Sequence, residues 1–138
     1  MYTAIQEIQE TFEEKGLKHR IEQVDDSWIL RAGVAGKSTR YEFLFVKERE
    51  EGNDVAVRVF DYARIPEGKR DQIWETLNEF QIKYRYTRFC MKDDGNVLVE
   101  YDFPVEFSPI GEGAAELLIR MTKIMDECYP ILMKAIWS

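Results

Sequence analysis

The chain has 138 residues, of which 45% are hydrophobic, and its formal net charge at pH 7 is −7. This composition excludes an intrinsically disordered chain, and the length predicts one domain, residues 1–138, that buries its own core. Because binding to nucleic acid or to anionic lipid requires clustered lysine and arginine, the acidic balance argues against nucleic acid and membranes as partners.

The N-terminal part of the chain predicts one helix and then four strands. Thr3 and Gln6 have the spacing of a capping box, and Gly16 stands where the left-handed residue that ends a helix belongs. Beyond Gly16 the apolar residues recur at every second position, which is the period of a half-buried strand. The expected strands are residues 17–22, 28–34, 39–46 and 55–65. Their short connections predict antiparallel neighbours.

A second helix is expected after Pro66, because a proline in the first turn of a helix forfeits no hydrogen bond. Ile73, Leu77 and Phe80 recur at helical spacing and are expected to face the core, with Trp74 beside them. This helix leads directly into the most informative turn of the sequence.

A tight hairpin is expected over residues 84–103. Gly95 fits the left-handed position of a three-residue turn that closes with a G1 bulge. That turn sets Arg88 opposite Glu100, which is a favourable cross-strand pair. A two-residue turn would set Phe89 opposite Glu100 instead, so the first register is preferred.

The last helix is expected from Ala114 to Ile136. Its apolar residues, among them Met121 and Met125, cover an arc that is broader than one side of a small sheet normally covers. Pro130 lies inside this pattern and is expected to kink or break the helix.

The expected order of elements is α-ββββ-α-ββ-α, with an irregular crossing between Pro104 and Pro109 before the last helix. Strands and helices that are segregated in this way predict an α+β fold, in which helices pack on one twisted antiparallel sheet. No repeat, low-complexity tract or interdomain linker divides the chain.

The patterns that would indicate catalysis or metal binding are incomplete. Gly36-Lys37-Ser38 matches the end of a phosphate-binding loop, but Arg31 stands where the first glycine of that motif belongs, so a hairpin turn is expected. His19 is the single histidine, and it alternates with Leu17 and Ile21, which favours a partly packed side chain. We expect no catalytic residue, no cofactor and no metal, and hence no enzyme.

The two cysteines, Cys90 and Cys128, belong to no CxxC motif and to no cluster with histidine. They are expected to be free thiols in a reducing compartment. The N-terminus has no basic segment followed by an apolar run, and no stretch reaches the roughly 18 consecutive apolar residues of a membrane span. We therefore expect a cytoplasmic protein.

Residues 83–92 combine tyrosines with lysines and arginines. Aromatic rings beside cations can stack on bases, so this segment is the strongest case for a nucleic-acid surface. Glu100 and Asp102 on the partner strand, together with the net charge, argue against it. A solvated strand with cross-strand pairs is expected instead.

Several short motifs, taken in chain order, are similar to those of a known family. They are Ala63-Arg64-Ile65-Pro66, Leu77-Asn78, residues 83–89 (KYRYTRF), Asp94-Gly95 and residues 99–104 (VEYDFP). Together they resemble the YbjN family of bacterial sensory transduction regulators. One departure is that the family often repeats Asn shortly after Leu-Asn, where this chain has Phe80-Gln81.

The resemblance implies a fold and a mode of action, and it brings no catalytic residue. Families of this kind resemble the type III secretion chaperones, whose α/β sandwich binds extended protein segments and often forms dimers. The resemblance therefore implies a regulatory or chaperone-like module with a protein partner, which could be a second copy of the chain. We place the candidate protein-binding surface at Trp74, Phe80, Met121 and Met125, because exposed apolar patches mark interaction sites.

Two alternatives stay open at this point. The same four apolar residues could all belong to the core. The chain could also be a small-molecule-binding domain or an enzyme, with a pocket between the sheet and the helices.

Overall fold

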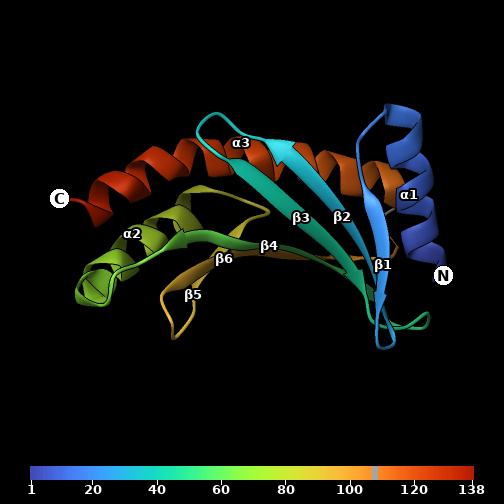
Figure 1. Cartoon of the computed structure of the whole chain (residues 1–138), viewed down its shortest axis with the longest axis horizontal. Coiled ribbons are helices and arrows are strands. Elements are labelled where there is room, and N and C mark those ends of the chain that lie inside the picture. The colour runs from blue at the N-terminus through green and yellow to red at the C-terminus, as the bar shows by residue number, and fades with distance from the viewer. Residues whose placement is uncertain (107–108) are drawn as a thin grey trace.

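A computed structural model describes residues 1–106 and 109–138, and within these residues three helices lie against one face of a six-stranded antiparallel sheet (Figure 1). Phe107 and Ser108, in the crossing expected before the last helix, lie outside the described residues. The helices are α1 (Thr3–Lys15), α2 (Arg70–Lys83), which follows the short 3-10 turn η1 (Glu67–Lys69), and α3 (Ile110–Ile136). The strands are β1 (Arg20–Val24), β2 (Ser27–Ala35), β3 (Arg40–Lys47), β4 (Asp54–Arg64), β5 (Arg88–Met91) and β6 (Asn96–Pro104).

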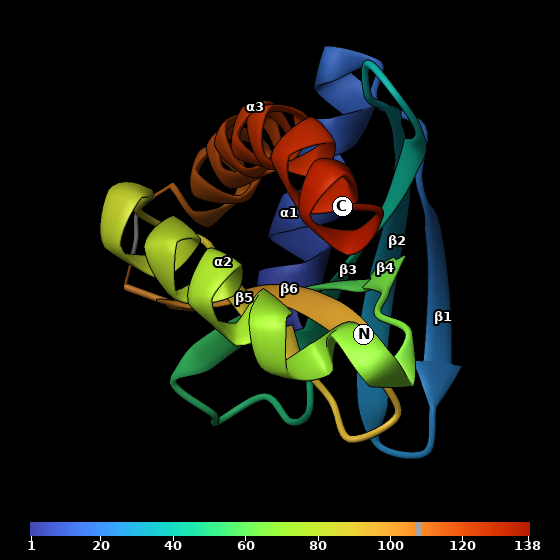
Figure 2. The same ribbon diagram turned by 90° about the vertical axis from the view of Figure 1, so that its left-hand side faces the viewer.

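The strand order in the sheet is β1-β2-β3-β4-β6-β5, so β1 and β5 form the two edges. The first four strands form a meander, and after α2 the β5–β6 hairpin adds β6 beside β4. Figure 2 shows β1, β2 and β3 beside the helices and β4, β6 and β5 below them, so the sheet curves around α3. The predicted element order and the α+β class are confirmed.

The predicted register of the hairpin is confirmed. Arg88 pairs with Glu100, and Phe89 pairs with Val99. Gly95 has a φ of 88°, in the left-handed region that a G1 bulge requires. The first strand of this hairpin, β5, is shorter than expected. It begins at Arg88, and the preceding residues from Tyr84 onward form no strand.

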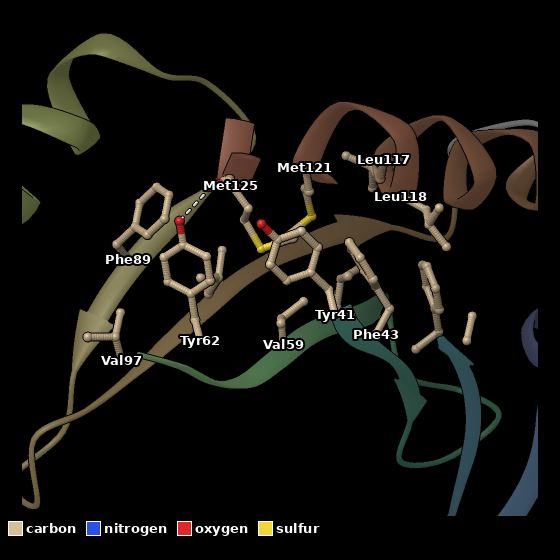
Figure 3. Packing of buried hydrophobic residues seen from close by; sticks show 14 of the residues in the cluster. Tyr41, Phe43, Val59, Tyr62, Phe89, Val97, Leu117, Leu118, Met121 and Met125 are labelled. Carbon is tan, nitrogen blue, oxygen red and sulfur yellow. Dashed lines mark hydrogen bonds between the residues drawn. The ribbon is translucent and has the colours of Figure 1, made fainter. Parts of the chain in front are cut away.

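Strand β4 contains a bulge that the sequence analysis did not predict. Its register against β6 shifts between Val59 and Ala63, and Asp61 adopts a left-handed φ of 56°. A bulge bends its strand and changes which side chains face the core. As a result Tyr62 points inward, and its hydroxyl donates a hydrogen bond of 2.6 Å to the Met125 carbonyl oxygen (Figure 3).

Helix α3 begins at Ile110, four residues earlier than expected, and continues without interruption through Pro130. The expected break at this proline is therefore wrong, and the helix curves gently over the sheet instead (Figure 1). Pro130 is exposed, so the hydrogen bond that it cannot donate is lost on the outer side of the helix. Met121 and Met125 face the sheet, fully buried.

The turn between β2 and β3 is fastened to α3 by one carboxylate. Asp126 accepts hydrogen bonds from the Lys37 backbone N–H at 3.0 Å and from the Tyr41 hydroxyl at 2.7 Å. Burial and this carboxylate raise the pKa of Tyr41. A Cβ on Gly36 would lie 2.6 Å from the Asp126 carboxylate oxygen, so glycine permits the close approach. Gly36-Lys37-Ser38 is thus a hairpin turn, as predicted.

The capping box predicted for α1 does not form. Tyr2 is the N-cap residue and makes no side-chain cap. Instead the Thr3 backbone N–H donates to Glu50 Oε2 at 2.9 Å, and the Thr3 hydroxyl donates to Glu50 Oε1. A carboxylate is favourable at this end of a helix, because the exposed N–H groups carry partial positive charge. These hydrogen bonds from Thr3 lower the pKa of Glu50.

We predict that Glu50→Gln destabilises the chain at neutral pH and that the difference disappears in acid. Because the folded pKa of Glu50 is lowered, its stabilisation is complete above the unfolded value of about 4.3 and is lost as the pH falls through the folded pKa. Chemical denaturation at several pH values measures this. Glu51→Gln, in the same exposed loop, is the matched control, and an equal effect of both variants at every pH would contradict the prediction.

Helices α1 and α3 cross closely at Gly111. A Cβ at this position would lie 2.7 Å from Thr11 Cβ and 2.8 Å from the Glu7 carbonyl oxygen. Gly111 therefore allows a contact between backbones that no larger residue permits, and Lys15 and Glu112 form an ion pair of 3.1 Å beside it.

We predict that Gly111→Ala lowers the free energy of unfolding by about 1–3 kcal/mol, because the added methyl overpacks this crossing. Without the crossing, alanine in a helix would be the stabilising choice. Gly68→Ala is the control, since a Cβ there meets no neighbouring atom. Urea denaturation measures both variants, and a Gly111→Ala chain as stable as the parent would show that the helices do not approach this closely.

Candidate functional site

The four residues expected to form a protein-binding surface do not lie together on the surface. Phe80 is 4% exposed, and Met121 and Met125 are fully buried, so these three belong to the core of the chain. Trp74 on α2 is 53% exposed. The sheet covers the broad apolar arc of α3 because it curves around the helix, which a flat sheet would not do.

Two surface hollows share one residue, Tyr86, which lies between α2 and β5. The first, of about 570 Å³, lies over the outer edge of the hairpin and is lined by Gln81, Tyr86, Thr87, Arg88, Glu100, Tyr101 and Asp102. The second, of about 490 Å³, lies along α3 and is lined by Lys83, Tyr84, Arg85, Tyr86, Glu116, Ile119, Arg120, Lys123 and Ile124. We call these two hollows together the Tyr86 surface.

Tyr86 is held in a strained conformation. Its φ of 59° lies in the left-handed region, which is rare for a bulky aromatic residue. The ring makes an edge contact with Tyr101 at a centroid distance of 5.7 Å, and the Arg120 guanidinium lies 5.8 Å from the ring centroid. Strain of this kind persists only where the surroundings enforce it, and it is concentrated at functional sites.

The residues that flank Tyr86 fix its position. Gln81 donates from its side chain to the Phe89 carbonyl oxygen at 2.6 Å, and it accepts from the Phe89 backbone N–H at 3.1 Å. Thr87 is buried, and its hydroxyl donates to the Arg85 carbonyl oxygen at 3.1 Å. The end of α2 and the start of β5 are therefore tied together, and the turn between them must project Tyr86 outward.

The floor of the first hollow is a neutralised charge cluster. Glu100 is largely buried and pairs with Arg58, at 3.1 Å between Nε and Oε2, and with Arg88. The Cys90 thiol lies 3.5 Å from the same carboxylate, and burial followed by this neighbouring charge raises the pKa of Cys90. Because both carboxylate oxygens are engaged by arginines, Glu100 acts as a structural ion-pair partner here.

The second hollow is lined by more cationic than acidic side chains. Lys83, Arg85 and Lys123 form no ion pair with any carboxylate in the described residues. Arg120 pairs with Glu116, at 2.8 Å between Nε and Oε1. Ile119 is 46% exposed on the same side of α3. The hollow thus combines cations, aromatic rings and aliphatic side chains.

The remaining reactive side chains are packed rather than poised for chemistry. Burial raises the pKa of Cys128 to about 12, which leaves almost no thiolate at neutral pH. His19 lies against Phe12, and its Nδ1 is 2.8 Å from the Leu17 carbonyl oxygen, as expected of a partly packed histidine. Within residues 1–106 and 109–138 there is no group of three or more potential metal ligands. No described helix is both long enough and apolar enough to cross a bilayer.

Only part of the Tyr86 surface is recognisable from the sequence. The aromatic and basic composition of residues 83–88 was the available signal, although these residues were expected to form a strand. Arg120 and Lys123 were missed, because they lie on α3, more than thirty residues further along the chain, and only the packing of α3 brings them to Tyr86.

Fold and site together define an α+β protein that presents a basic, aromatic surface at the junction of α2, β5 and α3. Comparison with protein families gives a match over residues 4–125 to the YbjN model, described as "Putative bacterial sensory transduction regulator". The chain belongs to the YbjN family, which confirms the resemblance found in the sequence, and this family is named as a regulator and not as an enzyme. The comparison with curated proteins finds no match.

We predict that Tyr86→Gly is more stable than Tyr86→Ala by about 1 kcal/mol, because both lose the ring but only glycine relieves the left-handed strain. At Glu79, an exposed position inside α2, the order should reverse, with glycine less stable than alanine by about 1 kcal/mol. Thermal or urea denaturation of the four variants measures both differences. Equal stability of the two Tyr86 variants would contradict the assigned backbone conformation.

Proposed function

We propose that this protein is a non-enzymatic regulator that binds a segment of a partner protein at the Tyr86 surface. The observation that carries the proposal is Tyr86 itself, an aromatic ring that is held outward by a strained backbone between two hollows. Tyrosine and arginine dominate binding energy at protein interfaces, and both are present here. The family description as a sensory transduction regulator supports the regulatory role.

The likeness of such families to type III secretion chaperones supports an extended segment as the ligand. The two hollows lie on either side of one ring, which suits a chain that passes over Tyr86 and places side chains in both. A second copy of this chain is a competing partner, because chaperones of that fold often form dimers. The two cysteines are unpaired, which is consistent with action in the cytoplasm.

The alternative function, a small-molecule site or an active site between the sheet and the helices, has less support. That space contains the packed side chains of Tyr41, Phe43, Tyr62, Met121 and Met125 (Figure 3). All five are buried. A ligand there would have to displace core residues, whereas a segment on the Tyr86 surface displaces only water.

Affinity capture from the native host, with quantitative mass spectrometry, tests the proposal with Tyr86→Gly and Phe60→Ala. We expect a partner protein to be enriched by the parent chain and by Phe60→Ala, and to be lost with Tyr86→Gly. Phe60 is a matched control, since it is an aromatic residue exposed to nearly the same extent, 45% against 42%. Loss of a central anchor should weaken binding by about 2 kcal/mol, or roughly thirtyfold.

Light scattering of the parent chain and of Tyr86→Gly then distinguishes a foreign partner from a second copy. A dimer that becomes a monomer in Tyr86→Gly would assign the surface to self-association. Partners that are captured equally by all variants would place binding elsewhere, and the absence of any partner would argue against the proposed function.

A further inference from the structure

The positive charge of the Tyr86 surface contrasts with the charge of the whole chain. The protein has a formal net charge of −7, yet the second hollow brings four cationic residues together against one carboxylate, Glu116. Two of the cations, Lys83 and Arg85, come from the end of α2 and the turn after it. The other two, Arg120 and Lys123, come from α3, so both walls of the hollow carry charge.

Two arginines on the exposed face of the sheet are each held by two carboxylates. Arg31 pairs with Glu22 at 2.5 Å, between Nε and Oε1, and also with Glu42 at 3.4 Å. Arg58 pairs with Glu100 at 3.1 Å and with Asp102 at 2.6 Å. Lys83, Arg85 and Lys123 have no such carboxylate partner within the described residues, and all three line the second hollow.

We infer that the segment bound at this surface is an acidic peptide, in which carboxylates flank an aliphatic side chain. The inference rests on the proposed function, and it names the chemistry of the partner. Carboxylates of the segment would pair with Arg85 on one wall and Lys123 on the other. An aliphatic side chain between them would contact Ile119, which is half-exposed, and the ring of Tyr86.

The surface fits a peptide better than a nucleic acid. A phosphate backbone carries one charge at every nucleotide, and the overall charge of −7 repels such a dense polyanion. Glu116 and Asp102 also line the hollows on either side of Tyr86, where closely spaced phosphates would meet them. A peptide can place its few carboxylates opposite the cations and avoid these two residues.

Selection of a random peptide library on the intact chain tests the inference. We expect the selected peptides to be enriched in Asp and Glu around Leu, Ile or Val, and their affinity to fall as the salt concentration rises. In fluorescence anisotropy with a selected peptide, Arg85→Glu/Lys123→Glu should weaken binding by about tenfold or more. Selection on this variant should enrich basic peptides instead.

Lys18→Glu/Arg49→Glu is the matched control. It makes the same change in net charge at two exposed residues, one just before the opposite edge strand β1 and one between β3 and β4, and it should bind the peptide like the parent. If the charge reversal in Arg85→Glu/Lys123→Glu disturbs folding, Arg85→Gln/Lys123→Gln removes the two positive charges without adding negative ones. Circular dichroism of each variant confirms that it is folded.

The outcomes separate the inference from the proposed function. Peptides that lack acidic enrichment, or that bind the Arg85→Glu/Lys123→Glu variant as well as the parent, would overturn the inference and leave peptide binding intact. Tighter binding of a single-stranded oligonucleotide than of any selected peptide, lost in the same variant, would overturn it in favour of nucleic acid. If no peptide is selected and no partner is captured, both fail.

Discussion

The structure depends on the curvature of the sheet around α3. This helix is apolar over a broad arc, and its burial requires a surface that reaches around it. The bulge at Asp61 bends β4 and turns Tyr62 inward, where its hydroxyl bonds the Met125 carbonyl oxygen. The adjacent Asp126 bonds the turn between β2 and β3. Two neighbouring residues of α3 therefore fix the helix to both halves of the curved sheet.

This packing also creates the Tyr86 surface. Helix α2 runs antiparallel to the C-terminal half of α3: Lys69 donates to the Ser138 carbonyl oxygen at one end, and Tyr84 meets Glu127 at the other. The chain must then turn from α2 to the edge strand β5 within a few residues, and the left-handed Tyr86 makes this turn. The packing that covers α3 therefore also places the ring of Tyr86 beside the cationic residues of α3.

Electrostatics divides the surface into two regions of different character. On the open face of the sheet, Arg31 and Arg58 pair with carboxylates of neighbouring strands. Exposed pairs of this kind contribute little to stability, about 0–1 kcal/mol each, and the arginines in them are already engaged. At the Tyr86 surface, Lys83, Arg85 and Lys123 form no ion pair within the described residues, so an oppositely charged ligand could pair with them. The proposed binding of a partner segment therefore rests on a small part of the chain.

The sequence by itself determined the elements and one register, because these follow from local chemistry. Alternating apolar residues predicted the meander, and Gly95 predicted the turn that sets Arg88 opposite Glu100. Only the tertiary structure decided the cap of α1, the bulge at Asp61, the burial of Met121 and Met125, and the meeting of Tyr86 with Arg120. Each of these features joins residues that are distant in sequence or depends on how the sheet bends. A local sequence pattern predicts neither long-range contacts nor the bending of the sheet.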